Sequence, residues 1–295
     1  MIENLPEVRG NYRDNYDLSK VTWFAVGGPA EVLFRPADIA DLQHFIQECP
    51  SSIPITVIGL ASNLLVRDGG IKGIVIRMGR EFAQISHQEN RITAGAAALT
   101  GNVARYAAEQ GLSGLEFYVG IPGSVGGALA MNAGAYHQDT ASILLEAQAV
   151  DPLGNLVRLT PDDIGYVYRG NHLPDGYIFT NATYQCIDDE PASIKDRMNR
   201  IMQQREASQP VRAKTGGSTF KNPQEKSAWK LIDEAGCRGL RIGGAHMSEK
   251  HCNFMINDQH ASAADIETLA ETIRKKVHEH SGILLEWEIK RIGER

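Results

Sequence analysis

The sequence predicts an α+β fold, because strand-like and helix-like segments alternate irregularly along its 295 residues. Short apolar runs typical of strands are followed sometimes by another strand and sometimes by a helical pattern. A regular strand–helix–strand series would instead predict a parallel α/β sheet. The acidic, proline-ended segment 188–191 indicates a joint. We therefore expect two regions, residues 1–190 and residues 191–295.

The expected elements of the first region are mostly strands. They cover residues 32–34, 55–58, 74–76, 91–94, 144–150, 156–159 and 177–187. Helical periodicity marks residues 38–49 and 102–110, and the second of these segments stops at Gly111, a typical C-cap. In the second region, helices are expected at 193–208, 229–235 and 264–280, and strands at 253–256 and 284–292.

Composition excludes several classes of partner. The formal net charge is −6 without a basic block, which argues against nucleic acid binding. No stretch approaches the roughly 20 apolar residues of a membrane span, and the N-terminus lacks a signal-peptide pattern. The four cysteines form no C-x-x-C pair and the nine histidines show no metal-ligand spacing. We expect a cytoplasmic protein without a metal, a membrane partner or an obligate protein partner.

The glycine-rich run at residues 120–134 is the most informative segment of the chain. Its first half allows close approach of a backbone, and its second half is small, apolar and compatible with a helix. Such a run can form a cradle of backbone N–H groups at a helix start, which favours a diphosphate. The spacing fits neither the G-x-G-x-x-G pattern nor a P-loop. A tight turn before a closely packed helix, with no ligand, is the equal alternative.

Two polar clusters could carry chemistry. Ser218 follows two glycines in the segment 216–223, so that a ligand could approach its hydroxyl. A turn or N-cap serine is the commoner alternative, and the absence of G-x-S-x-G disfavours an acyl-transfer nucleophile. Arg169, in the aromatic segment 166–172, could clamp a carboxylate. It could equally stack on Tyr168 or form a surface ion pair.

A third cluster lies near the end of the chain. In a strand over residues 285–290, Glu286 and Glu288 would point to one face and Trp287 to the other. Either glutamate could face a pocket, although exposure to solvent is the default. Arg212 and Lys214 could meet phosphate, although exposure to solvent is the commoner alternative. His251, with His246, lies nearest a plausible site, but a structural or surface histidine is the commoner alternative.

Taken together, five segments in order resemble one family. They are residues 22–30, 59–66, 120–136, 217–223 and 285–293. The chain resembles UDP-N-acetylenolpyruvoylglucosamine reductase, and its spacing is similar to the shorter branch that lacks an extra tyrosine loop. The resemblance implies a FAD-binding region of the p-cresol methylhydroxylase type in two subdomains, followed by a C-terminal α+β substrate domain. It also implies non-covalent FAD, NADPH as hydride donor and UDP-N-acetylglucosamine enolpyruvate as substrate.

The resemblance also implies roles for individual residues. Ser218 would protonate the substrate α carbon, and Arg169 and Glu288 would hold and polarise its carboxylate. The implied cofactor-binding residues are Gly59, Ala61, Ser62, Asn63, Leu64, Gly120, Ile121, Pro122, Gly123, Ser124, Gly126, Gly127 and Asn132. The expected substrate-binding residues are Tyr168, Lys221, Asn222, Arg212, Lys214 and His251.

Two positions depart from the family pattern. Ala61 stands where the second loop usually has glycine, and a methyl group there is a small change if φ is negative. Gly170 and Asn171 follow Arg169 in place of a small polar residue. Two other functions remain open: a flavin-dependent sugar or alcohol oxidase, and a non-enzymatic flavin- or nucleotide-binding module.

Overall fold

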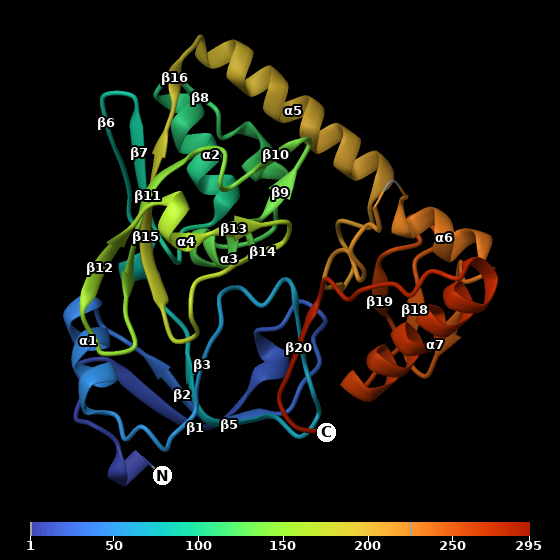
Figure 1. Ribbon diagram of the computed structural model, residues 1–295, viewed down its shortest axis with the longest axis horizontal. Helices are drawn as coiled ribbons and strands as arrows, with labels where there is room; N and C mark the ends of the chain where they lie inside the picture. The colour runs from blue at the N-terminus through green and yellow to red at the C-terminus, as the bar shows by residue number, and fades with distance from the viewer. Residues whose placement is uncertain (1, 225) are drawn as a thin grey trace. The chain divides into compact units, whose positions relative to one another are not determined.

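A computed structural model describes residues 2–224 and 226–295, and these form a mixed α+β fold (Figure 1). The predicted fold class is confirmed. The chain divides into two compact units, which we describe separately. Unit 1 contains the residues up to Asp14, Val32–Gly59 and Gly73–Gln204, and unit 2 contains Asn15–Glu31, Leu60–Lys72 and Arg205–Arg295. The predicted division into a FAD-binding region (1–190) and a substrate domain (191–295) concerns which ligand each region binds, so it stays a prediction.

Unit 1 is organised around an antiparallel sheet with the strand order β12-β11-β15-β7-β6. Its strands are β12 (Leu156–Leu159), β11 (Leu144–Val150), β15 (Ile178–Gln185), β7 (Arg91–Gly95) and β6 (Ile85–Gln88). Helices α2 (Thr100–Glu109) and α3 (Val125–Met131) share one buried core with these strands. Small side chains such as Ala104, Ala107 and Ala128 let the helices pack closely.

A second sheet has the strand order β1-β2-β5-β3. The strands are β1 (Asn11–Asp17), β2 (Pro29–Arg35), β5 (Ile71–Ile76) and β3 (Ile55–Val57). In unit 1, helix α1 (Ile39–Glu48) buries Leu42 and Phe45 against Phe34 and Ile74. Asp38 caps this helix by accepting a hydrogen bond from the Asp41 N–H at 2.9 Å.

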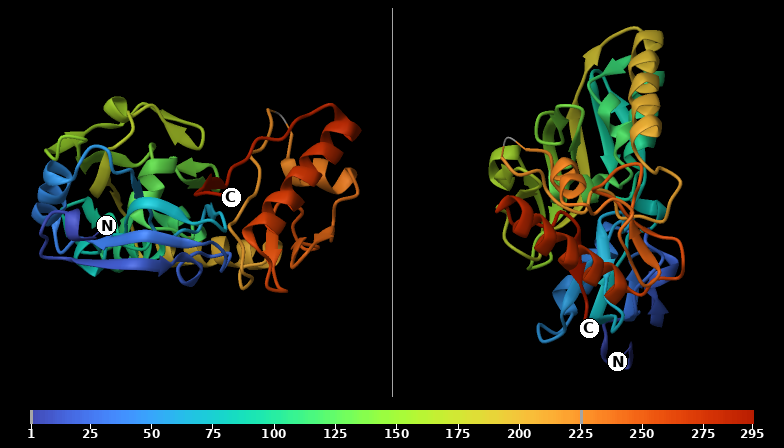
Figure 2. Two further views of the ribbon diagram at one scale, coloured as in Figure 1. Left: turned by 90° about the horizontal axis from the view of Figure 1, so that it is seen from below. Right: turned by 90° about the vertical axis from the view of Figure 1, so that its right-hand side faces the viewer.

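Unit 2 contains the antiparallel sheet β17 (Arg241–Ile242), β18 (Ala245–Met247) and β19 (Met255–Asn257). Helix α6 (Ala228–Glu234) and the longer α7 (Ala263–Ser281) bury their apolar faces in the same core, and α7 contacts β18. Helix α7 is the long red helix in Figure 2. A capping box between Ser262 and Asp265 starts α7, and Gly282 ends it at φ 73°. Strand β20 (Lys290–Ile292) pairs in parallel with β4 (Leu64–Val66).

The remaining elements are short, apart from α5 (Pro191–Ser208), in which only Ile194 and Met198 are buried. They are η1 (Ile2–Asn4), η2 (Leu18–Lys20), η3 (Arg80–Phe82), β8 (Leu112–Ser113), η4 (Glu116–Gly120), β9 (Gly134–Ala135), β10 (Gln138–Asp139), α4 (Pro161–Ile164), β13 (Tyr166–Val167), β14 (Gly170–Asn171) and β16 (Ile187–Asp188). Within residues 2–224 and 226–295, none of the helices combines the length and the apolar character needed to cross a bilayer.

The predicted helices all exist, with ends shifted by one or two residues. The strand expected at 284–292 is wrong for most of its length, because only β20 is regular strand. Leu285 and Ile289 are both buried, as a strand period would allow, but between them the segment makes only a single bridge, at Trp287, and no continuous ladder. The sequence analysis also missed β1, whose residues are almost all polar.

Candidate active site

The glycine-rich run lies in unit 1, where it leaves η4 and enters α3. Ser124 is the N-cap of α3, and its Oγ accepts a hydrogen bond from the Gly127 N–H at 3.4 Å. Asn132 ends the helix in the left-handed conformation, with φ 42°. The predicted turn followed by a helix is therefore present.

The first amides of α3 are bonded to the protein itself. The N–H of Val125 donates to the carbonyl of Ala98 at 2.9 Å, and that of Gly126 donates to Ala96 at 2.8 Å. A Cβ on Gly126 would lie 3.0 Å from the Ala96 Cβ. The expected diphosphate cradle therefore lacks these two amides, and close packing explains why residue 126 is glycine.

The part of the run before Ser124 is bound by one residue of α2, Thr100, through its side chain and its backbone. The Thr100 hydroxyl donates to the carbonyl of Ile121 at 2.5 Å, and the Thr100 N–H donates to the carbonyl of Gly123 at 3.1 Å. These bonds fix the backbone on both sides of Pro122. The loop conformation is thus set before any ligand binds.

Two distant segments of unit 1 meet at Ser124. A Cβ on Gly59, directly after β3, would lie 2.7 Å from the Ser124 Oγ. A Cβ on Gly120 would lie 2.6 Å from the ring of Tyr136. Side chains at either glycine would push these segments apart, so both glycines are explained by close approach.

The remaining residues of the second loop belong to unit 2. Ala61 is 4% exposed and has φ 52°. A methyl group is expected to be a small change only if φ is negative, and this condition is not met. A left-handed conformation costs an L-residue roughly 1–2 kcal/mol. Ser62 and Leu64 are half-buried, and Leu64 begins β4.

Arg169 occupies the turn of the tight hairpin β13–β14 in unit 1, again with φ 59°. Its guanidinium carbon lies 5.1 Å from the centre of the Tyr168 ring, so the predicted stacking is present. A Cβ on Gly134 would lie 2.7 Å from the Gln138 carbonyl oxygen and 3.1 Å from the Arg169 Nη1. The close backbone therefore explains this glycine first, and its lack of a side chain also leaves room for the guanidinium. The Asn132 side chain donates to the Val167 carbonyl at 3.2 Å and holds the hairpin beside the run.

Ser218 lies in unit 2 on a short extended segment and is half-buried. Ser218 bridges to Phe254, and Phe220 bridges to Trp287. The N–H of Glu288 donates to the Thr219 carbonyl at 2.8 Å. The structure thus brings the predicted proton donor and the predicted polarising glutamate onto neighbouring, hydrogen-bonded segments.

Glu288 is also tied to the second predicted flavin loop. The Asn63 amide donates to the Glu288 carbonyl at 3.0 Å, and the Lys290 N–H donates back to the Asn63 carbonyl at 3.0 Å. These bonds continue into the parallel pairing of β20 with β4. Three segments that the sequence analysis singled out separately are therefore neighbours in unit 2.

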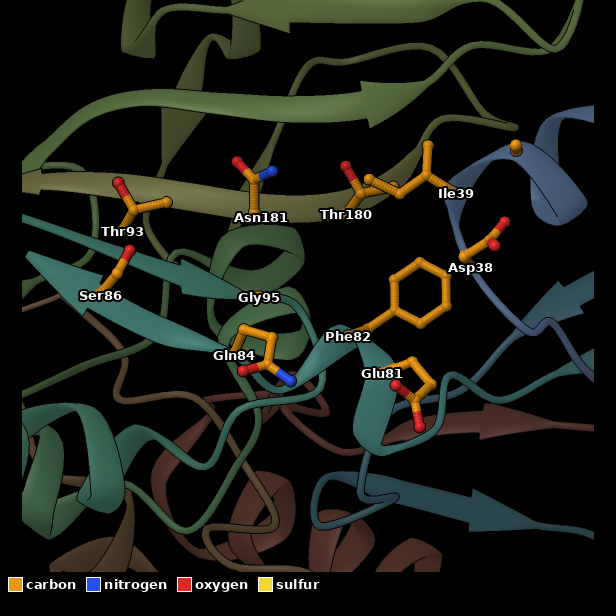
Figure 3. A pocket seen from close by; sticks show the side chains of 11 residues that line it. Asp38, Ile39, Glu81, Phe82, Gln84, Ser86, Thr93, Gly95, Thr180 and Asn181 are labelled. Atoms are coloured by element: carbon orange, nitrogen blue, oxygen red, sulfur yellow. The ribbon is translucent and has the colours of Figure 1, made fainter.

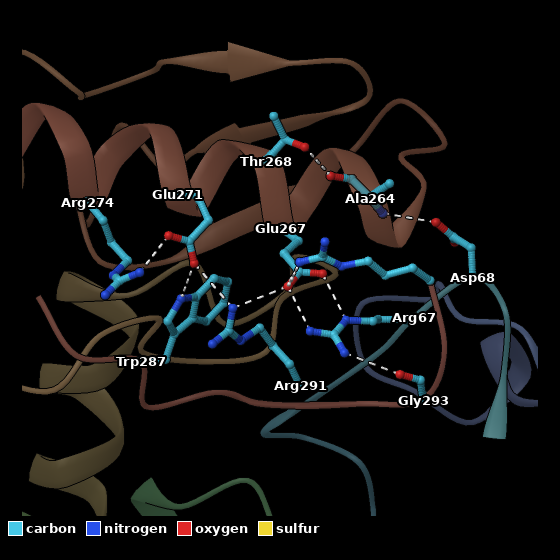
Figure 4. A network of polar contacts seen from close by, with 11 residues as sticks. Arg67, Asp68, Ala264, Glu267, Thr268, Glu271, Arg274, Trp287, Arg291 and Gly293 are labelled. Carbon is cyan, nitrogen blue, oxygen red and sulfur yellow. Dashed lines mark hydrogen bonds and ion pairs between the residues drawn. The ribbon is translucent and has the colours of Figure 1, made fainter. Parts of the chain in front are cut away.

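A network of charged side chains surrounds Trp287 and Arg291, which lie on either side of Glu288 in the sequence (Figure 4). The Trp287 indole N–H donates to Glu271 at 2.8 Å, and the Arg291 guanidinium lies 4.4 Å from the Trp287 ring centre. Arg67 binds Glu267 with two bonds of 2.9 and 3.0 Å. This pairing, above all its hydrogen bonds, holds the pKa of Glu267 below its usual range.

The predicted substrate-binding residues of unit 2 have varied surroundings. Lys221 pairs with Glu286 at 3.7 Å, and the Asn222 side chain accepts a bond from the Ala228 N–H at 3.0 Å, which caps α6. Arg212 and Lys214 are exposed.

His251 is half-buried and packs edge-on against Phe254. Its Nδ1 accepts a hydrogen bond from the Asn253 N–H at 3.3 Å. Burial lowers the pKa of His251 below its ordinary value. The ring is therefore neutral near pH 7, and it offers an anion a hydrogen bond rather than a charge.

A pocket of about 410 Å³ opens elsewhere on unit 1 (Figure 3). Phe82, Gln84, Thr93 and Asn181 face it, and none of the residues predicted from the sequence lines it. The contacts of the buried Asn253 and of the partly exposed Glu271 were also missed. Their partners lie 33 and 16 positions away in the sequence, so no local sequence pattern predicts these contacts.

Comparison with known proteins bears on these sites. Residues 30–160 match the family described as FAD binding domain, and residues 209–292 match UDP-N-acetylenolpyruvoylglucosamine reductase, C-terminal domain. The reductase of Parvibaculum lavamentivorans is 53% identical over 100% of this chain and 95% of its own length. That of Azorhizobium caulinodans is also 53% identical, over 98% of this chain and 94% of its own.

Solved structures agree with these sequence comparisons. The crystal structure of UDP-N-acetylenolpyruvylglucosamine reductase from Thermus caldophilus matches with a TM-score of 0.84 and 34% identity, over 97% of this chain and 100% of that one. The 6-hydroxy-D-nicotine oxidase of Arthrobacter nicotinovorans matches with a TM-score of 0.50 and 13% identity, over 95% of this chain and 62% of that one. That second similarity concerns the fold alone.

A FAD-binding domain on this fold defines a flavin-dependent oxidoreductase. Identity above one half over nearly the full length of both chains narrows the assignment further. The chain belongs to the UDP-N-acetylenolpyruvoylglucosamine reductase family.

Proposed function

We propose that this protein uses NADPH and FAD to reduce UDP-N-acetylglucosamine enolpyruvate to UDP-N-acetylmuramate, a precursor of peptidoglycan. The observation that carries the proposal is the 53% identity to a reductase over 100% of this chain. The neighbouring segments of Ser218 and Glu288 support it, because the reaction needs a proton donor close to a group that binds a carboxylate. The reaction would take place in the cytoplasm and needs no protein partner.

The residues present fit a non-covalently held FAD. Gly59 and Ser124 approach so closely that a Cβ on the glycine would reach the serine hydroxyl at 2.7 Å. The cofactor would be held by the small side chains and backbone of residues 59–64 and 120–127, with Asn132 supporting the run. When bound, FAD supplies to the substrate β carbon the hydride that it receives from NADPH.

Ser218 would donate the proton that the α carbon needs. Serine is a weak acid, so proton transfer requires close and fixed geometry. The backbone around Ser218 is held on one side by the bridge to Phe254 and on the other by the bond between Thr219 and Glu288. A rigid segment of this kind supports the proposed role.

Arg169 would bind the substrate carboxylate, on which negative charge builds up during the reaction. A fixed donor aimed at such a charge typically contributes about 3–4 kcal/mol to lowering the barrier. The contact with the Tyr168 ring and the close approach to Gly134 restrict the position of the guanidinium before substrate binds. Glu288 is half-buried, and beside a second carboxylate it would have to share a proton with it.

The nucleotide part of the substrate would meet the other candidates. The exposed cations Arg212 and Lys214 suit its diphosphate, whereas neutral His251 would contribute a hydrogen bond. Lys221 would act near Ser218 through its charge, which Glu286 partly balances at 3.7 Å. Asn222 would act through the backbone, since its side chain already caps α6.

The test separates the two half-reactions in stopped-flow absorbance. In Ser218→Ala, reduction of bound FAD by NADPH should stay near the wild-type rate. Reoxidation by the enolpyruvyl sugar nucleotide should slow by about 10²–10⁴-fold, the usual contribution of a positioned proton donor. Ser227→Ala is the matched control, because Ser227 precedes α6 without a side-chain capping bond.

Two results would overturn the proposal. Protein that binds no FAD would remove its basis. Flavin that is reoxidised rapidly by oxygen, with no response to the enolpyruvyl substrate, would indicate an oxidase instead. Equal loss of both half-reactions in Ser218→Ala would assign this serine a structural role.

A further inference from the structure

Asn253 holds the segment of Ser218 with its side chain as well as with its backbone. Its Nδ2 donates to the Phe220 carbonyl at 2.8 Å, and its Oδ1 accepts from the Phe220 N–H at 3.0 Å. Its own carbonyl accepts from the Thr219 N–H at 2.7 Å. One residue thus makes three bonds to two consecutive residues, directly after Ser218.

The opposite edge of the same segment is bonded to the segment of Glu288. The Thr219 carbonyl accepts from Glu288 at 2.8 Å, and the Lys221 N–H donates to the Glu286 carbonyl at 2.9 Å. Both backbone groups of Phe220 and the Thr219 N–H therefore bind Asn253, while the Thr219 carbonyl and the Lys221 N–H bind residues 286–288. The segment lies between the Asn253 amide and the chain that carries Glu288.

Asn253 is 3% exposed, so water does not readily replace these bonds. A buried backbone N–H or carbonyl left without a partner costs about 1–3 kcal/mol. Phe220 is itself fully buried, and its ring lies 5.6 Å from that of Trp287. Any rotation of the Asn253 amide would therefore shift the backbone between Ser218 and Glu288.

We propose that Asn253 is a positioning residue, whose amide fixes the orientation of Ser218 relative to Glu288 for transfer of the proton to the substrate. It acts through Phe220 and touches neither substrate nor cofactor in this role. This inference rests on the proposed function, because it assumes that Ser218 is the proton donor.

The decisive variant is Asn253→Asp, which keeps the shape and changes one donor into an acceptor. The ionised carboxylate still accepts from the Phe220 N–H but repels the Phe220 carbonyl, whereas the protonated acid can donate to it. At pH 8 we expect substrate-driven reoxidation to slow on the order of a hundredfold, as for a small misplacement of a reacting group. The rate should recover as the pH falls and the new carboxyl gains its proton.

Other titrating groups surround this place and define the baseline. They include His251 and Cys252 in the same loop, Glu288 across the segment, and Asp233, which contacts the Cys252 thiol at 3.7 Å and pairs with Arg238. All of them are present in the wild-type protein. If the reoxidation rate of the variant rises at low pH and that of the wild type does not, the introduced carboxyl is therefore the cause.

Asn257→Asp is the matched control. Asn257 is equally buried, at 5%, and its side chain likewise donates to one backbone carbonyl, of Phe24, and accepts one N–H, of Ala261. This variant should lose a similar amount of thermal stability. Its reoxidation rate should not show the rise at low pH that is expected of Asn253→Asp. Asn253→Ala is the second variant, which should slow reoxidation at every pH and also serves if the buried carboxylate prevents folding.

The outcomes separate this inference from the proposed function. Reduction of FAD by NADPH should stay within about twofold of wild type in each folded variant, well under the tenfold that 1.4 kcal/mol represents. If both Asn253 variants reoxidise as fast as wild type while Ser218→Ala is slow, the positioning role is wrong and the proposed function stands. If Ser218→Ala is also as fast as wild type, the proposed function itself fails.

Discussion

The two units hold their candidate site residues by different means. In unit 1, the glycine-rich run is fixed by backbone bonds and by close contact, as where Gly126 meets Ala96. In unit 2, buried side chains hold the backbone, as where Asn253 binds Phe220. Unit 1 should therefore be sensitive to added volume, and unit 2 to changes in charge and hydrogen bonding.

The largest expected contrast lies in the pH dependence of stability. In unit 2, Arg67 lowers the pKa of Glu267, so this stabilisation is present above the unfolded-state pKa and is lost as the pH falls through the lower folded value. In unit 1, burial raises the pKa of Tyr118 to about 12, so stability is full below the ordinary value near 10 and is lost as the pH rises through about 12. We expect the Glu267 ion pair to make unit 2 lose stability in acid, and Tyr118 to make unit 1 lose stability in alkali.

Spectroscopy can follow the two units separately. Tryptophan fluorescence reports unit 2, which contains all three tryptophans of the chain, Trp23, Trp229 and Trp287. Phenolate absorbance reports the buried tyrosines of unit 1. Glu267→Gln should flatten the acid dependence of the fluorescence transition. An unchanged acid dependence in this variant, or complete tyrosine ionisation near pH 10, would contradict the contrast.

Two adjacent glycines of α3 test the importance of volume in unit 1. Gly126→Ala places a methyl group 3.0 Å from Ala96 and should lower the free energy of unfolding by about 1–3 kcal/mol. Gly127→Ala meets only the Ser124 Oγ, at 3.5 Å, and should raise it by about 0.5–1 kcal/mol, because alanine favours the helix. Denaturation of the protein freed of FAD measures both.

The same pair distinguishes packing from ligand binding. If Gly127 lies against FAD, Gly127→Ala should weaken FAD retention although it stabilises the chain. Equal stability changes in the two variants would mean that the Gly126 contact does not decide the fold of this run.

The smallest effect is expected at Ala61. Ala61→Gly removes the cost of a left-handed alanine, roughly 1–2 kcal/mol, but adds up to about 1 kcal/mol of glycine chain entropy. Because the two effects oppose each other, the net stabilisation should lie between about 0 and 1.5 kcal/mol, seen as a small rise in melting temperature. Ala61→Val should lower the free energy of unfolding, because a branched side chain tolerates the left-handed conformation less well than alanine does. A large loss of stability in Ala61→Gly would show that the methyl contacts matter more than the strain.

Local patterns were enough to predict most of the fold. The apolar stripe of α7 and its capping residues lie within a few positions of one another, so the helix could be placed from the sequence alone. The segment around Glu288 was misjudged, because burial of Leu285 and Ile289 in the core of unit 2 decides its path. The polar strand β1 carries no apolar alternation, so only its pairing in the sheet reveals it.

The candidate site divides in the same way. The glycine run, Ser218 and Arg169 stood out through their neighbours in sequence. The φ of 52° at Ala61 could not be inferred, because alanine usually adopts negative φ. The amide of Asn253 was equally hidden, since its importance lies in a partner 33 positions away.

The parallel pairing of β20 with β4 has a consequence for synthesis on the ribosome. Asn63 and Glu288, which bond beside this pair, are 225 positions apart. At about 5–20 residues per second, the earlier strand waits roughly ten to forty-five seconds for its partner to emerge. The neighbourhood of the candidate residues Ser218 and Glu288 in unit 2 is therefore incomplete until residues 290–292 have left the exit tunnel.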